Sequence, residues 1–282
     1  MSFPGTMESS VPCEKRVEGV LMSETKLAGR PCVVVTGAAR GIGFATAKRL
    51  ASAGFSVALV DLDAERLERS AAQLRGDGHD VLAITADIAD PASGDRLIAS
   101  TVERFGRVDG LAHVAGVGVR AVQDILDVSA DDYDRCANVN GRAAFFMMQR
   151  FARHFIATAD TGAHRFMAIV TSSNASALSI DRSEYCVSKA TASMATQLFA
   201  ARLAPHGVAV FEIRPGVIST ELTAPRIEAY RRRAVNENLT AIPRLGQVDD
   251  VARCIETVAL GLLPYTVGQV INVDGGIQSR RY

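Results

Sequence analysis

The chain has 282 residues, of which 48% are hydrophobic and 22% are charged, so it is long enough to bury a large core. Its 31 lysines and arginines balance 31 aspartates and glutamates, which excludes the basic footprint of a protein that binds nucleic acid or an anionic membrane. We therefore expect a small molecule as its partner, with no nucleic acid and no membrane.

The cysteines lie far apart and form neither a CxxC pair nor a metal-ligand spacing, which predicts reduced thiols and no metal site. They are Cys13, Cys32, Cys136, Cys186 and Cys254. The apolar stretches are too short or too interrupted to span a bilayer, and the N-terminal segment carries Glu8, Glu14 and Glu18 instead of an apolar secretory core. We expect a cytoplasmic protein.

Residues 1–28 show neither helical nor strand periodicity and mix proline and glycine with charges, so we expect a mobile N-terminal extension. It is either a native segment, a vector-encoded remnant, or the product of an upstream start codon with Met22 as the true start. Residues 29–282 are predicted to form one domain.

From Cys32 onward, short β-branched runs alternate with longer helical patterns. The runs are CVVVT (32–36), SVALV (56–60), DVLAIT (80–85), GLAHV (110–114), FMAIV (166–170), VAVFEI (208–213) and QVINV (269–273). Runs that are apolar on both faces are typical of parallel strands covered by helices on both sides. The sequence therefore predicts an α/β fold, a single Rossmann domain with a doubly wound parallel sheet of about seven strands.

The first run leads into TGAARGIG (36–43), followed by the helical pattern FATAKRLASAG. Glycines at 37, 41 and 43 permit a tight turn, a close approach to a pyrophosphate and a close helix contact, while the helix N-terminus offers free N–H groups. This placement favours a dinucleotide site over a purely structural turn.

Asp61 ends the second run, 18 residues beyond Gly43, where a carboxylate can accept hydrogen bonds from the adenosine ribose. We therefore expect a preference for NAD(H). Because Arg40 could partly offset the repulsion of a 2′-phosphate, NADP(H) remains possible. The alternative interpretation is that Asp61 only caps the next helix.

Tyr185 and Lys189 stand four residues apart in SEYCVSKATASMATQLFAARLA, so both lie on one face of a predicted helix. An ammonium beside a phenol lowers the phenol's pKa and makes Tyr185 a candidate general acid or base. Thirteen residues upstream, Ser172 follows a predicted strand and could bind the substrate oxygen. Asn140, in NVNGRAAFF, falls in another helical pattern.

Eight motifs, taken in their order along the chain, resemble the short-chain dehydrogenase/reductase family over residues 28 to 278. They are TGAARGIG, Asp61, ADI (86–88), NVN, Ser172, YxxxK, RPGVIST (214–220) and VDGG (273–276). Within the family the chain looks nearest to proteins labelled 3-ketoacyl-acyl-carrier-protein reductases, because of VTSSNAS, RSEYCVSKA and LTAPRIEAY.

The resemblance implies that Tyr185 is the general acid/base, that Lys189 lowers its pKa and binds the nicotinamide ribose, that Ser172 orients the substrate oxygen and that Asn140 holds a relay water. It implies no metal. The cofactor-binding residues it implies are Gly37, Arg40, Gly41, Ile42, Gly43, Asp61, Asp87, Ile88, Ala115, Gly116, Tyr185, Lys189, Pro215, Gly216, Ile218 and Thr220. Asp87 and Ile88 would contact the adenine, and Ile218 and Thr220 the carboxamide.

Where the family usually has NNAG, this chain has HVAG (113–116), and His113 is interpreted as a structural residue. By the resemblance we expect a homo-oligomer, a tetramer or dimer, with residues 278–282 near a neighbouring subunit. The segment 220–244 should cover the substrate and be mobile. Its cluster Arg231, Arg232 and Arg233 favours a solvated helix face over an anion site.

These observations predict an NAD(H)-dependent oxidoreductase that interconverts a secondary alcohol and a ketone. The alternative is a reductase of 3-oxoacyl thioesters, which would use the same catalytic residues. A third hypothesis, a dinucleotide-binding sensor without catalysis, is disfavoured by the intact set Ser172, Tyr185 and Lys189.

Overall fold

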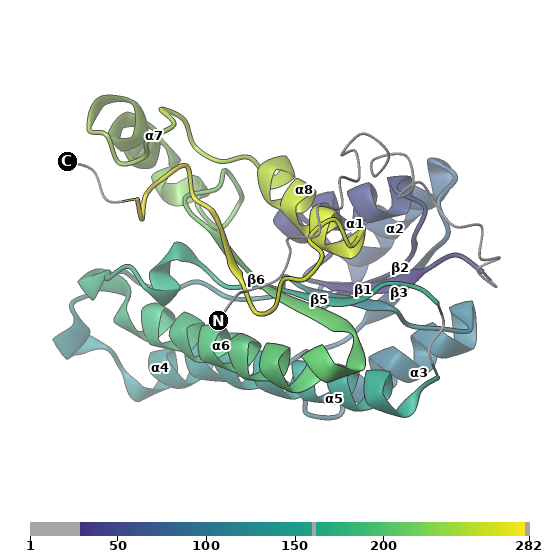
Figure 1. The fold of residues 1–282 in the computed structure, drawn as a ribbon. Coiled ribbons are helices and arrows are strands. Elements are labelled where there is room, and N and C mark those ends of the chain that lie inside the picture. Colours follow the sequence, from purple (N-terminus) through teal and green to yellow (C-terminus); the bar gives the residue numbers. More distant parts are fainter. Residues whose placement is uncertain (1–28, 160–161, 280–282) are drawn as a thin grey trace, which may run out of the picture.

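The computed structural model describes residues 29–159 and 162–279. The predicted N-terminal extension lies outside the described residues, as do residues 280–282 of the expected subunit contact. Seven strands form one parallel sheet in the order β3-β2-β1-β4-β5-β6-β7 (Figure 1). They are β1 (Cys32–Thr36), β2 (Ser56–Asp61), β3 (Val81–Thr85), β4 (Gly110–His113), β5 (Arg165–Val170), β6 (Val208–Pro215) and β7 (Val270–Val273). The predicted doubly wound sheet is confirmed.

Eight α-helices accompany the strands within the described residues. They are α1 (Gly41–Ser52), α2 (Ala64–Gly76), α3 (Ser93–Phe105), α4 (Ala130–Cys136), α5 (Ala143–Ala157), α6 (Ser183–Leu203), α7 (Ile227–Asn236) and α8 (Val248–Ala259). Figure 1 shows α1, α2 and α8 on one side of the sheet and α3, α4, α5 and α6 on the other. None of the described helices is long and apolar enough to cross a membrane.

Two hydrophobic clusters, one on each face, hold these layers together. Successive side chains of a strand point to opposite faces, so Val33 and Val35 join the cluster under α1, α2 and α8, whereas Val34 joins the cluster over α3, α5 and α6. Met147 and Met148 of α5 are buried in the second cluster. The double-sided burial is the reason that the strands read as continuous apolar runs.

The chain order reverses between β1 and β4, which pair with each other while β2 lies on the other side of β1. In parallel α/β sheets, ligands bind in the crevice at such a switch point, outside the carboxyl ends of the strands. Every strand here is parallel, so the segments that follow them all emerge at this one edge.

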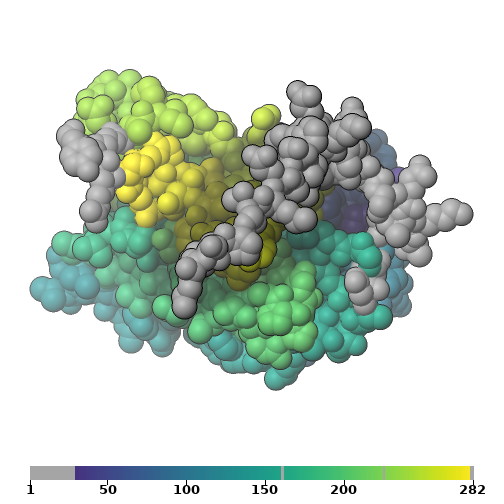
Figure 2. Space-filling view, in the orientation of Figure 1, coloured from purple at the N-terminus to yellow at the C-terminus, as the bar shows by residue number. Residues whose placement is uncertain are grey.

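The segment after β6 carries a small core of its own. Tyr230 and Ala234 of α7 pack with Leu245 and with the half-buried Val217 and Leu239. Figure 2 shows this segment as a yellow-green ridge above the body of the molecule. The segment that was predicted to cover the substrate thus contains helix α7, and this small core anchors the helix.

Candidate active site

The glycine loop after β1 leaves no room for larger residues. A Cβ at Gly37, where φ is +69°, would lie 2.9 Å from Ala115 Cα, and a Cβ at Gly43 would lie 2.0 Å from the carbonyl oxygen of Gly37. Gly41 also has a positive φ of +56°. Helix α1 then begins without a side-chain cap and without an acidic residue in its first turn. Its positive end therefore offers N–H groups to an anion, which fits the pyrophosphate of a dinucleotide.

Asp61, at the end of β2, faces this loop. Its Oδ2 accepts a hydrogen bond from Ala39 N–H at 3.0 Å, and its Oδ1 accepts one from Asp63 N–H at 3.2 Å. Helix α2 is capped by Asp63, whose side chain accepts from Arg66 N–H, so the interpretation of Asp61 as the helix cap is wrong. Each Asp61 oxygen keeps a lone pair for a ribose hydroxyl.

Two arginines beside Asp61 are joined by a carboxylate that the sequence analysis did not single out. Glu221, just after Thr220, pairs with Arg40 and, at 2.9 Å, with Arg66. Hydrogen bonds from Arg66 and Arg40 hold the pKa of Glu221 below its usual value. All three side chains are exposed, so the cluster is open to a ligand on this edge.

The segments after β3 and β4 complete the cofactor side. Asp87 is exposed, with its Oδ1 accepting from Ala89 N–H at 2.9 Å, and Ile88 packs partly against the core. Ala115 N–H donates to Thr36 Oγ1 at 3.2 Å. A Cβ at Gly116 would lie 2.9 Å from Asn140 Oδ1 and 3.2 Å from Lys189 Nζ, so this glycine brings the backbone against the catalytic side chains.

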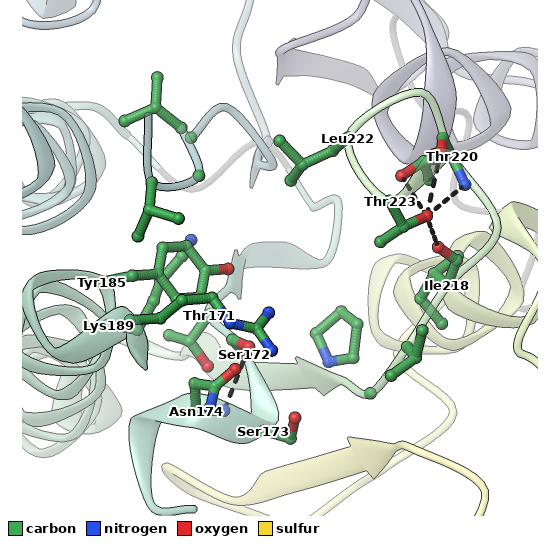
Figure 3. Close-up of a pocket in the computed structure, with 18 of the residues that line it drawn as sticks. Thr171, Ser172, Ser173, Asn174, Tyr185, Lys189, Ile218, Thr220, Leu222 and Thr223 are labelled. Carbon is green, nitrogen blue, oxygen red and sulfur yellow. Dashed lines mark hydrogen bonds between the residues drawn. The ribbon is translucent and has the colours of Figure 1, made fainter. Parts of the chain in front are cut away.

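A cavity of about 450 Å³ opens beside this edge, within the size range of small-molecule sites. Figure 3 shows Ser172, Tyr185 and Lys189 on one side of it, with Ile218, Thr220 and Leu222 across from them. The predicted site residues that line it are Ile42, Gly116, Ser172, Tyr185, Lys189, Pro215, Gly216, Ile218 and Thr220. The predicted residues outside it are those of the adenosine side, Gly37, Arg40, Asp61, Asp87 and Ile88, together with Gly41, Gly43, Ala115 and Asn140.

Tyr185 and Lys189 lie in the first turns of α6, and Lys189 Nζ is 5.8 Å from the centre of the Tyr185 ring. Lys189 Nζ donates to the carbonyl oxygen of Val170 at 3.2 Å. Ser172, two residues beyond the end of β5, caps a short helical turn by accepting from Asn174 N–H at 3.1 Å. Two chain segments, the one after β5 and the start of α6, therefore place a phenol, an ammonium and a hydroxyl together.

Burial governs the titration of this group. It raises the pKa of Tyr185 above its usual value, while the Ser172 hydroxyl and the Arg182 charge lower it in part. Burial also lowers the pKa of Lys189 to about 8. The sequence analysis expected Lys189 to lower the pKa of Tyr185, but in the structure the loss of hydration outweighs the favourable charges.

Asn140 is buried in a π-helical turn, Ala137–Arg142, between α4 and α5, where the sequence predicted ordinary helix. Its Oδ1 accepts from Val117 N–H at 2.9 Å, and its Nδ2 donates to Val117 O and to Ser188 Oγ, each at 3.0 Å. Both amide protons are thus used. The side chain ties the segment after β4 to α6, one residue before Lys189.

The segment from Pro215 to Thr220 is held in a compact turn. Thr223 Oγ1 donates to Ile218 O at 2.6 Å and accepts from Thr220 N–H at 3.1 Å. Gly216 has no space for a side chain, because a Cβ there would lie 2.7 Å from Asp274 Cα. Thr220 reaches the glycine loop, where its Cγ2 would be 3.9 Å from a Cβ at Gly41.

His113 replaces an asparagine of the family pattern and is buried beneath the site. Thr36 Oγ1 accepts from Val114 N–H at 3.1 Å and lies 3.0 Å from His113 Nδ1, so the hydroxyl donates its proton to that nitrogen. Burial, together with the charge of Lys189, lowers the pKa of His113 to about 3. The imidazole is therefore neutral and structural, as the sequence analysis predicted.

A buried carboxylate behind the catalytic residues was missed from the sequence. Glu212 of β6 accepts hydrogen bonds from Thr171 Oγ1 at 2.5 Å, from Ser193 Oγ at 2.8 Å and from Arg214 Nε at 2.6 Å. Thr171 precedes Ser172, and Ser193 lies one turn after Lys189. The signal in the sequence was an acidic residue inside the apolar run VAVFEI.

Comparison with known proteins identifies the class. The family model described as enoyl-(acyl carrier protein) reductase matches residues 37–278. L-rhamnose 1-dehydrogenase (NAD(P)(+)) of Sphingomonas sp. (strain SKA58) is 31% identical over 255 residues, which cover 89% of this chain and 98% of that protein. Sorbitol dehydrogenase of Cereibacter sphaeroides is 33% identical over 257 residues, covering 86% and 95%.

Solved structures agree. A 3-oxoacyl-[acyl-carrier protein] reductase from Brucella melitensis in complex with NAD has a TM-score of 0.86 and 30% identity, covering 90% of this chain and 99% of that one. The fold and the site define an oxidoreductase that acts on CH–OH groups. The chain belongs to the short-chain dehydrogenase/reductase family.

Proposed function

We propose that the protein interconverts a secondary alcohol and a ketone with NAD(H), using Tyr185 as the general acid/base. The observation that carries this proposal is the single cavity in which Ser172, Tyr185 and Lys189 meet the Pro215–Thr220 segment, beside the glycine loop. The arrangement contains a proton carrier, a hydrogen-bond donor for a carbonyl oxygen and a dinucleotide cradle. A dinucleotide-binding sensor without catalysis would need neither the proton carrier nor the hydrogen-bond donor.

In the reductive direction the Tyr185 Oη–H donates its proton to the ketone oxygen, while the Ser172 hydroxyl donates a hydrogen bond to the same oxygen as it becomes negative. A nicotinamide held beside the glycine loop and the Pro215–Thr220 segment would supply the hydride for this reduction. Lys189 keeps two N–H groups beyond the one given to Val170 O, and these are free to bind a ribose hydroxyl and to stabilise a phenolate.

The raised pKa of Tyr185 keeps the phenol protonated at neutral pH, which is the form that ketone reduction needs. Oxidation of an alcohol needs the phenolate, so its rate should rise with pH up to the pKa of Tyr185. Reduction should fall over the same range.

Asn140 acts in this scheme as a positioning residue. Because both of its amide protons are used, a relay water can bind only to its acceptors, which are the remaining lone pair of Oδ1 and the backbone carbonyl.

We propose NAD(H) as the preferred cofactor. A 2′-phosphate would meet the negative charges of Asp61 and Glu221, and Glu221 already occupies Arg40 and Arg66. The Brucella melitensis neighbour in complex with NAD supports this choice. The Sphingomonas relative, named for NAD(P)(+), supports weaker use of NADP(H) as well.

The runner-up reaction is reduction of a 3-oxoacyl thioester, favoured by the Brucella melitensis reductase and by the description of the matching family model. Both reactions use the same catalytic group. The cytoplasmic location and the assembly into a tetramer or dimer stay predictions.

Replacing Tyr185 tests the function directly. We expect Tyr185→Phe to lower kcat by about 10²- to 10⁴-fold on any alcohol or ketone that the wild type converts, because it removes the proton carrier. NADH affinity, followed by fluorescence titration, should stay the same. Tyr133→Phe, at an exposed tyrosine of α4, is the matched control. Wild-type rates in Tyr185→Phe would disprove the assignment, and tighter binding of NADPH than NADH would disprove the cofactor preference.

A further inference from the structure

We infer that the substrate carries a carboxylate, which Arg182 binds beside Tyr185 with help from Arg226. This inference rests on the proposed function and narrows its substrate to short hydroxy and oxo acids. It starts from the charge of the cavity wall. Four cationic side chains line the cavity, Arg120, Arg182, Lys189 and Arg226, and no carboxylate is among the described residues that line it.

Two of these cations already have other roles. Arg120 pairs with Asp132 at 3.1 Å. Lys189 is buried and hydrogen-bonded to Val170 O, beside Tyr185. The cavity's charge is therefore least compensated at Arg182 and Arg226.

Arg182 and Arg226 share one distant carboxylate. Asp181 lies 3.9 Å from Arg182 Nε and 3.9 Å from Arg226 Nη1, beyond hydrogen-bond distance, and it accepts instead from Ser179 Oγ at 2.6 Å. The Nε of Arg182 is buried and makes no hydrogen bond within the described part of the chain. The side chain of Arg182 as a whole is 29% exposed and lines the cavity, so the remaining N–H groups of its guanidinium can meet a ligand there.

The guanidinium of Arg182 is also positioned. It lies 5.9 Å from the centre of the Tyr230 ring, which belongs to the anchored helix α7. Arginine on an aromatic face presents its planar edge to a partner, the geometry that suits bidentate binding of a carboxylate.

Arg182 lies close to the phenol of Tyr185. It is the residue before α6, which begins at Ser183, and its side chain lines the same cavity as Tyr185. The Arg182 charge lowers the pKa of Tyr185, in agreement with this proximity. A carboxylate on Arg182 is therefore only a few bonds from the carbon whose oxygen meets Tyr185.

Part of the wall is apolar, with Val117, Val119, Val122 and Leu222 lining it (Figure 3 labels Leu222). The short hydrocarbon chain of a hydroxy or oxo acid fits these side chains. The arginine cluster of α7 plays no part, because Arg231 pairs with Glu228 and both Arg232 and Arg233 pair with Glu237.

The reaction balances without a further reactant. In the oxidative direction the hydroxyl proton of the hydroxy acid passes to the Tyr185 phenolate, its C–H bond delivers a hydride to NAD⁺, and the products are the oxo acid and NADH. The carboxylate stays intact.

The test compares an acid with its neutral ester. Reduction of 3-oxobutanoate and of methyl 3-oxobutanoate by NADH is measured for the wild type, Arg182→Met, Arg182→Lys and, as a control outside the cavity, Arg231→Met. We expect the wild type to prefer the acid. The acid-to-ester ratio of kcat/KM should fall by about 10- to 100-fold in Arg182→Met, the loss of a charge-assisted hydrogen bond. The ratio should recover partly in Arg182→Lys and stay unchanged in Arg231→Met.

A binding measurement separates this inference from the proposed function. Calorimetric titration of the NAD⁺-loaded protein with butanoate and with butanamide should show tighter butanoate binding that Arg182→Met removes. If no alcohol or ketone is turned over, the proposed function fails and the calorimetry alone decides the role of Arg182. Equal binding of acid and amide, or an acid-to-ester ratio insensitive to Arg182→Met, overturns the inference. The inference also fails if the wild type prefers 3-oxobutanoyl-coenzyme A over 3-oxobutanoate and Arg182→Met removes that preference. Arg182 would then bind a phosphate of coenzyme A and not a carboxylate of the substrate.

Discussion

Arg40 and Glu221, 181 residues apart in the chain, form an ion pair across the mouth of the cofactor site. Arg40 belongs to the glycine loop and Glu221 to the segment that follows β6. Glu221 also pairs with Arg66 of α2, so one carboxylate occupies both arginines that lie beside Asp61. A phosphate on the adenosine ribose would have to compete with it.

Removing the Glu221 charge should therefore improve the use of NADPH. We expect Glu221→Gln to raise the affinity for NADPH relative to NADH by about fivefold, a modest effect because the pairs are exposed. The gain should shrink at high salt. Glu228→Gln, which breaks the exposed pair with Arg231 on α7, is the matched control. Fluorescence titrations with both cofactors measure the ratio, and an unchanged ratio would show that Glu221 does not affect the choice.

The glycine loop can be tested by adding single methyl groups. In Gly43→Ala the new Cβ would meet the backbone oxygen of Gly37, so the loop must move, at a cost of about 1–3 kcal/mol. We expect loss of NADH binding and a lower Tm. Gly76→Ala, at the end of α2 with nothing within 4 Å of its Cβ, should leave NADH binding intact and slightly raise Tm. Normal NADH affinity in Gly43→Ala would contradict the assignment of the glycine loop as the dinucleotide site.

His113 should make the fold sensitive to acid. Its pKa is about 3 when folded and near 6.5 when unfolded, so between these values the unfolded chain binds the extra proton. The contribution of His113 to stability is thus complete above pH 6.5 and is lost as the pH falls toward 3, by about 1.4 kcal/mol per unit. Between pH 7 and pH 5 the free energy of unfolding should therefore fall by about 2 kcal/mol less in His113→Asn than in the wild type. Urea denaturation at the two pH values measures this, with the exposed His206→Asn as control.

Glu212 should matter both to stability and to catalysis. Glu212→Gln leaves Arg214 without its buried partner charge, which typically costs about 3–5 kcal/mol. Because Thr171 and Ser193 lose the same anchor, Ser172 and Lys189 should be held less firmly and kcat should fall with little change in NADH affinity. Glu256→Gln, in a more exposed pair with Arg49, should lower Tm less and leave kcat unchanged. Equal Tm and kcat in both variants would refute the anchoring role.

The sheet and the positions of the catalytic residues could be predicted because local patterns determine them. Each apolar run became a strand within about two residues of its predicted ends. Gly37, Asp61, Ser172 and Pro215 lie at or just beyond the ends of strands, so the parallel topology alone brings them to one edge. The spacing of Tyr185 and Lys189 determined their common helix face.

The residues that the sequence analysis missed owe their roles to contacts that no local pattern encodes. Glu221 reaches Arg40 and Arg66 only because the segment after β6 folds back over the glycine loop. The sequence analysis did not single out Arg182, because its place in the cavity wall depends on how the segments before α6 and after β6 fold together. The raised pKa of Tyr185 was missed for the same reason, since burial is a property of the folded chain.

The position of β6 determines when the site can form during folding. The glycine loop and Asp61 depend on β1, β2 and β4, which are neighbours in the sheet. Thr171, the residue before Ser172, is instead anchored by Glu212 of β6, which comes late in the chain. Parallel pairs require long connections to close before their contacts form, which slows their folding. A growing chain that ends before β6 lacks both the support of Ser172 and the Pro215–Thr220 segment that lines the cavity, so the site can be completed only after most of the chain has been synthesised.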